Sequence, residues 1–320
     1  MAEKTWYDYF IDNLCEKYPK KTQLVYELMN LLHLERETVY RRLRKDVLFS
    51  MHEVVKIASA WGVSLDELIG INTGHISFQM RQMNYLDPSE EELKFLRYVI
   101  QSIGYLKNFS DTEFMDISNK LPRQLVAGFE HLNQYYLFKW MYQYNTEKEI
   151  IPYSETFISD EKIHLTKDYY EAIKLVPNSN FIWDRRLFDY LVTDIQYFHS
   201  IQLITDEEKE LIKKDLYALM DYMLDVANGG CYPETQNKVN LYISQLNVDT
   251  NYSYTFTPEA NVCYIHVFEK YEIYTFNPEM TANFRMWMQL KKRTSVQISE
   301  VDERRRIEFF AKQRQLIDGL

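Results

Sequence analysis

Residues 22–45 read TQLVYELMNLLHLERETVYRRLRK, and they carry the strongest structural pattern in the first part of the chain. Leucine recurs at intervals of three and four residues from Leu24 to Leu32, which predicts a helix over residues 22–32 with one apolar face. A second helix is expected over residues 35–45, with Val39 and Leu43 on its inner face. The sequence therefore predicts two helices joined by a tight turn.

The outer face of the second helix is cationic. Residues 36–45 carry five basic side chains and one acidic one, a local charge of +4 in a chain of 320 residues whose formal charge is −10. A helix-turn-helix places its second helix in the major groove of DNA, where arginine binds guanine and other basic side chains meet phosphates. The candidate DNA-binding residues are Arg36, Glu37, Thr38, Tyr40, Arg41, Arg42, Arg44 and Lys45. The alternative is a charged helix face that is simply solvated.

Three further helices are expected around this pair. Residues 4–18 are amphipathic at helical spacing. Capping boxes at residues 50–53 and 64–67 each begin another helix, and a glycine ends each of them. Five short helices predict one compact helical domain over residues 1–74.

Residues 4–70 resemble the lambda-repressor-like helix-turn-helix domains of the XRE type, in a BetR-like variant. The sequences YRRLR at residues 40–44 and GVSLDEL at residues 62–68 carry the resemblance. It implies that residues 35–44 form the recognition helix. The residues that it places near base edges or the DNA backbone are Arg36, Glu37, Thr38, Arg41 and Arg42. The chain departs from the family where Gln, Ala and Gly are usual, since it holds Val25, Met29 and His33 there.

The remaining residues are expected to form a linker or short strand at 75–89, a helical region at 90–235 and an α+β region at 236–320. Periodicity predicts helices at 90–107, 111–118, 122–145, 166–175, 180–202 and 206–227. Strands are expected near 239–243, 252–256, 262–267, 271–276 and 296–298, with helices at 278–292 and 301–317. The fold class is therefore mainly α. Residues 236–320 form either a small domain of their own or a sheet packed on the helical region.

The composition shows where the charge of the chain lies and indicates its cellular compartment. Residues 1–75 carry a charge of −1 and residues 76–320 carry −9, so the acidic surplus lies outside the expected reading helix. The chain shows neither a signal peptide nor an apolar stretch of about 18 residues. Its three cysteines are far apart, which fits a reducing compartment. We expect a soluble cytoplasmic protein without a membrane partner.

No catalytic or metal-binding motif stands out in the sequence. The seven histidines and three cysteines do not fall at zinc-ligand spacing, and there is neither a phosphate-binding glycine loop nor a G-x-S-x-G motif. We therefore expect no enzyme activity, no metal and no cofactor. Nine basic side chains in residues 285–314 leave two interpretations open, an anion-binding surface or a solvated helix face.

These patterns together predict a sequence-specific DNA-binding transcriptional regulator, with helix 35–45 in the major groove of double-stranded DNA. Residues 90–320 are expected to sense a signal from a small-molecule or protein effector, or to form a homodimer. A dimer implies a palindromic operator with half-sites about one helical turn apart. The alternative is a protein-interaction scaffold whose helical module does not bind DNA. A third possibility is an enzyme within residues 236–320.

Overall fold

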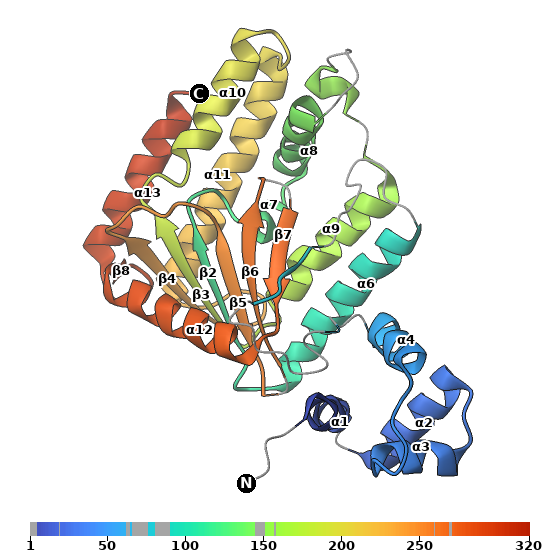
Figure 1. Ribbon diagram of the computed structural model, residues 1–320. Coiled ribbons are helices and arrows are strands. Elements are labelled where there is room, and N and C mark those ends of the chain that lie inside the picture. The colour runs from blue at the N-terminus through green and yellow to red at the C-terminus, as the bar shows by residue number, and fades with distance from the viewer. Residues whose placement is uncertain are drawn as a thin grey trace. The chain divides into compact units, whose positions relative to one another are not determined.

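The structure is a computed structural model that divides into two compact units, Met1–Ser77 and Phe78–Leu320 (Figure 1). It describes residues 5–18, 20–61, 65, 76–80, 90–144, 151–156, 158–258, 260–268 and 271–320. The first unit contains the predicted pair of helices. The second contains a mixed sheet with helices on both faces. The coarse prediction of a mainly helical chain with an α+β part is confirmed.

The first unit is a small helical body around one apolar core. Its helices are α1 (Trp6–Lys17), α2 (Lys21–Leu32), α3 (Arg36–Leu43) and α4 (Met51–Trp61). Each helix contributes fully buried side chains to the core, namely Phe10, Leu14, Leu24, Leu28, Val39 and Ile57. The period of the apolar residues therefore places one face of each helix inward, as the sequence predicts.

Local signals set the ends of these helices. The capping box predicted at Ser50 is confirmed, because Ser50 N and Oγ donate to Glu53 while Glu53 N donates to Ser50 Oγ. Helix α2 ends at His33, which adopts a left-handed conformation with φ 55°. Helix α3 is shorter than expected, and Lys45 with φ 68° turns the chain just after it. The helix expected from residue 64 lies outside the described residues, apart from Leu65.

The second unit is built on an eight-stranded sheet in the order β1-β7-β6-β5-β2-β3-β4-β8. Its strands are β1 (Gln79–Met80), β2 (Glu113–Ser118), β3 (Asn178–Asp184), β4 (Lys238–Ser244), β5 (Tyr252–Phe256), β6 (Asn261–Val267), β7 (Tyr271–Thr275) and β8 (Ser295–Gln297). Strands β2, β3 and β4 are parallel, and the other pairs are antiparallel.

Helices cover both faces of this sheet. They are α6 (Glu90–Tyr105), α7 (Arg123–Val126), α8 (Glu130–Tyr144), α9 (Asp160–Ile173), α10 (Asp189–Ser200), α11 (Asp206–Gly229), α12 (Pro278–Arg293) and α13 (Glu303–Asp318), with short 3-10 helices at Leu106–Asn108 and Tyr153–Glu155. Helix α12 covers one face of the sheet (Figure 1). Its Phe284 and Met288 share a core there with Met115 and Ile117 of β2. The larger core on the other face joins β3 and β4 to α8, α10, α11 and α13.

Two predicted helices are wrong in this unit. Residues 113–118 of the helix expected at 111–118 form β2, and the first part of the helix expected at 180–202 lies in β3. Both strands are buried on both faces, and each holds only three apolar residues among polar ones, so neither shows the alternation by which periodicity recognises a strand. The helix expected at 122–145 is broken between α7 and α8, where Gly128 lies against Tyr170. Helix α9 begins at Asp160, earlier than expected.

The boundary expected after residue 235 does not separate two bodies. Strand β3 comes from the expected helical region and β4 from the expected α+β region, yet the two pair along their whole length. Strand β5 likewise pairs with β2. Because these ladders cross the expected boundary, residues 90–235 and 236–320 share one sheet. The short strand expected at 75–89 is present as β1, at the edge beside β7.

Candidate nucleic-acid interface

Helix α3 is held on its inner side and exposed on its outer side. Residues 33–35 separate it from α2, and its Val39 and Leu43 are buried in the core of the first unit. The opposite side of α3 therefore faces solvent, because the helical repeat puts the remaining positions outward. A helix presented in this way can enter a groove of DNA without disturbing the core.

Arg36 and Arg41 are the two exposed cations on α3 that remain available. Neither forms an ion pair with any residue in the described part of the chain. The guanidinium of Arg36 lies 5.6 Å from the centre of the Tyr40 ring, one turn along the helix. The guanidinium groups of Arg36 and Arg41 can therefore bind a phosphate or a guanine edge without first breaking a salt bridge.

Arg42, unlike Arg36 and Arg41, has a carboxylate partner and little exposed surface. Its Nη2 lies 2.8 Å from Glu53 Oε1 on α4, and the two side chains are only 15% and 13% exposed. Its Nη1 also donates to the carbonyl of Leu48, and its guanidinium lies over the Phe49 ring at 5.6 Å. These contacts tie α3 to the start of α4 and engage the guanidinium of Arg42 within the first unit.

Arg44 and Lys45 are exposed but have carboxylate partners. Arg44 lies 2.9 Å from Glu37 and 3.1 Å from Asp46, and the hydrogen bonds with these two carboxylates raise the pKa of its guanidinium. Lys45 binds Asp8 of α1 and holds the pKa of that carboxyl well below its usual range. The local charge of +4 therefore overstates the free cationic charge, because these partners offset much of it.

The other candidate residues on α3 lie around the two available arginines. Glu37 is exposed and faces Arg44, while Thr38 and Tyr40 are half-buried. Glu37 and Arg41 lie on the side of α3 opposite Val39 and Leu43, whereas Tyr40 lies at its flank and Arg36 is exposed at its start, about 140° around the helix from Arg41. The side chain of Arg42 instead points toward Glu53 at the start of α4.

Residues that hold the loop after α3 were not predicted. Tyr7 accepts a hydrogen bond from Phe49 N at 2.9 Å and donates to the carbonyl of Arg42 at 3.3 Å. Glu53 is visible in the sequence as a capping residue, but its second role as the partner of Arg42 is not. Periodicity reports which face of a helix is buried, whereas these contacts join residues far apart in sequence.

Most of the basic side chains near the C-terminus have partners within the second unit. Arg304 and Arg305 both pair with Glu308, and the buried Arg306 donates to the carbonyl of Ile298 at 2.8 Å. Lys292 lies 3.5 Å from Glu113 on β2. For these residues the structure supports helix-face and packing roles over an anion-binding surface.

The second unit holds buried polar groups that the sequence did not reveal. Asp116, in the middle of β2, is only 5% exposed, and burial raises its pKa to about 6. It accepts hydrogen bonds from Ser118 Oγ and from Gln124 Nε2, the latter at 3.1 Å. A carboxylate within the run EFMDIS is the signal that marks such a position. The bond from Gln124 joins β2 to α7, and together the two bonds satisfy the buried carboxylate of Asp116.

No protein-family model, no curated protein and no solved structure matches the chain. Within the described ranges, no three His, Cys, Asp or Glu side chains are grouped to hold a metal ion. No helix in the described part of the chain is long and apolar enough to cross a membrane.

Proposed function

We propose that the chain is a sequence-specific DNA-binding transcriptional regulator, with α3 in the major groove of double-stranded DNA. The observation that carries the proposal is the exposed surface of α3, where Arg36 and Arg41 have no carboxylate partner among the described residues. The close succession of α2 and α3 supports the same conclusion, since it is the arrangement of a helix-turn-helix. The second unit would sense a signal or hold a homodimer.

The two arginines are five positions apart on α3, which corresponds to about 7.5 Å along the helix axis and about 140° around it. Arg41 faces outward, and Arg36 adds an exposed cation at the start of the helix. Base pairs follow one another at about 3.4 Å, so the two side chains span about two base-pair steps. One such helix reads only a few base pairs, and a two-fold dimer would double the contacts on a palindromic site.

The proposal is tested by selecting bound duplexes from a random DNA pool with the full-length chain. We expect enrichment of a short palindrome, and loss of binding in Arg41→Glu. Lys56→Glu is the matched control, because Lys56 is an exposed lysine on α4 outside the proposed reading face. Absence of any enriched sequence, or equal binding by Arg41→Glu and the parent, contradicts the proposal.

A protein-interaction scaffold is the second candidate, and one observation favours it. Exposed apolar side chains follow α3 in the chain, with Leu48 55% and Met51 68% exposed, and Val47 and Val55 are exposed as well. Exposed apolar patches mark protein-interaction sites. A scaffold predicts that Met51→Lys abolishes partner binding while Arg41→Glu leaves it unchanged. A DNA-binding regulator predicts that Arg41→Glu abolishes DNA binding while Met51→Lys leaves it unchanged.

A further inference from the structure

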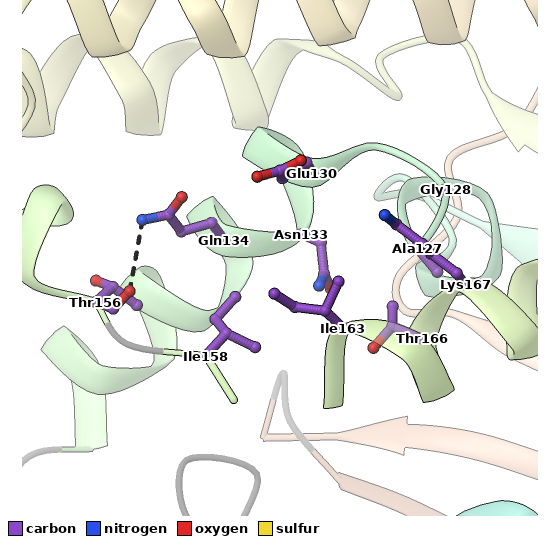
Figure 2. Close-up of a pocket in the computed structure, with 10 residues that line it drawn as sticks. All are labelled: Ala127, Gly128, Glu130, Asn133, Gln134, Thr156, Ile158, Ile163, Thr166 and Lys167. Carbon is purple, nitrogen blue, oxygen red and sulfur yellow. Dashed lines mark hydrogen bonds between the residues drawn. The ribbon is translucent and has the colours of Figure 1, made fainter. Parts of the chain in front are cut away.

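A cavity of about 360 Å³ opens in the second unit, beside the start of α8 and one face of α9 (Figure 2). Its volume lies in the range of small-molecule sites. Ten residues line it: Ala127, Gly128, Glu130, Asn133, Gln134, Thr156, Ile158, Ile163, Thr166 and Lys167. The sequence did not mark this region, because its walls come from three separate segments of the chain.

The walls of this cavity are fixed by contacts behind them. A Cβ at Gly128 would lie 2.7 Å from the Tyr170 ring, so the turn between α7 and α8 packs tightly on α9. The amide of Gln134 donates to the carbonyl of Tyr153 at 3.3 Å and to that of Thr156 at 3.5 Å (Figure 2). The cavity is therefore formed before any ligand arrives, which reduces the entropy lost on binding.

Polar groups with unused hydrogen-bonding capacity border the cavity. Glu130 and Lys167 come from the two helices that bound it, and neither forms an ion pair within the described ranges (Figure 2). Thr156 is only 5% exposed, and its buried hydroxyl has no hydrogen-bond partner among the described residues. A buried hydroxyl without a partner is costly, so it marks a place where a ligand group or a water belongs.

The lining specifies the chemistry of the ligand. Glu130 suits an ammonium group and Lys167 suits a carboxylate, and the two cancel in net charge. Ile158 and Ile163 add an apolar wall that suits a short hydrocarbon side chain. We propose that this cavity binds a small zwitterion of the amino-acid type, with Glu130 pairing its ammonium group and Lys167 its carboxylate.

Binding is tested on the full-length chain by calorimetry with the twenty L-amino acids. We expect at least one aliphatic amino acid to bind one to one and saturably. Its amine analogue, which lacks the carboxylate, and its acid analogue, which lacks the ammonium, should each bind about tenfold more weakly. Absence of binding at about 10 mM, where even a millimolar Kd is visible, overturns the proposal.

Two substitutions assign the two ends of the ligand. Lys167→Met should weaken binding of the amino acid about tenfold and leave the amine analogue unaffected, whereas Glu130→Gln should leave the acid analogue unaffected. Lys214→Met is the matched control, because Lys214 is exposed on α11 outside the cavity lining. Equal melting temperatures without ligand show that the variants are folded. If both substitutions leave the affinity unchanged, the amino acid binds elsewhere and the assignment is wrong. Ligand binding here is independent of whether α3 contacts DNA.

Discussion

Replacement of Arg42 by methionine should destabilise the first unit, although Arg42 belongs to the basic run of α3. Methionine keeps much of the apolar stem beside Phe49 but removes the guanidinium that binds Glu53 and the Leu48 carbonyl. Glu53 then loses its cationic partner at a place where its side chain is only 13% exposed. The change therefore tests whether Arg42 holds α3 in place.

The size of the effect follows from the contacts that are lost. A hydrogen bond to a charged group contributes about 1.5–3 kcal/mol, and Arg42 makes two, of which one is to a neutral carbonyl. Because the pair is not fully buried, we expect a loss of about 2–4 kcal/mol, below the cost of breaking a fully buried pair. For a unit of this size that lowers the melting temperature by at least about 10 °C.

Hydrogen exchange read by mass spectrometry measures this effect in the first unit alone, since peptides from α3 and α4 report its opening separately from the second unit. Arg44→Met is the control: the Arg44 side chain is 49% exposed, and an exposed ion pair contributes less than about 1 kcal/mol. Equal loss of protection in Arg42→Met and Arg44→Met would refute the positioning role of Arg42.

Three further outcomes are expected. Burial raises the pKa of Asp116 from 3.8 to about 6, so its contribution to stability is present below pH 4 and is lost as the pH rises through 6; it amounts to about 3 kcal/mol at most. The free energy of unfolding, measured with denaturant, should therefore fall less from pH 4 to pH 7 in Asp116→Asn than in the parent. An equal fall in the two proteins contradicts this. Gly128→Ala should cost about 1–3 kcal/mol because its Cβ meets Tyr170, whereas Gly104→Ala, with no atom within 4 Å of the added Cβ, should stabilise α6 by about 0.5–1 kcal/mol; similar melting temperatures for the two variants would show that the turn has room. Light scattering at micromolar concentration should give a dimeric mass, and a monomeric mass contradicts the proposed two-fold assembly.

The sequence predicts the helices of the first unit well, because each has a strong local signal. The leucine repeat of α2 and the Ser50 capping box of α4 are set by neighbours within a few residues. The outer face of α3 is also predictable from the helical repeat. The partners of Arg42 and Lys45 are not predictable in this way, since Arg42 meets Glu53 and Lys45 meets Asp8 only in the folded chain.

The second unit is predicted less well, for a reason rooted in its sheet. The antiparallel strands β5, β6 and β7 alternate enough to be recognised, whereas β2 and β3 are buried on both faces. Their parallel pairing joins distant segments, so no local pattern reveals it. The cavity lined by Glu130 and Lys167 depends on the same long-range packing, which explains why the sequence did not indicate it.

The measurement that tests the central proposal most directly is the affinity of the full-length chain for one selected duplex, compared between the parent, Arg41→Ala and Lys56→Ala. A bidentate arginine contact to a base contributes about 1–3 kcal/mol, so Arg41→Ala should raise Kd by about 10- to 100-fold and relax the preference at one base position. Lys56→Ala should bind as the parent does. If Arg41→Ala binds the selected duplex as tightly as Lys56→Ala, α3 does not read DNA and the proposed function is wrong.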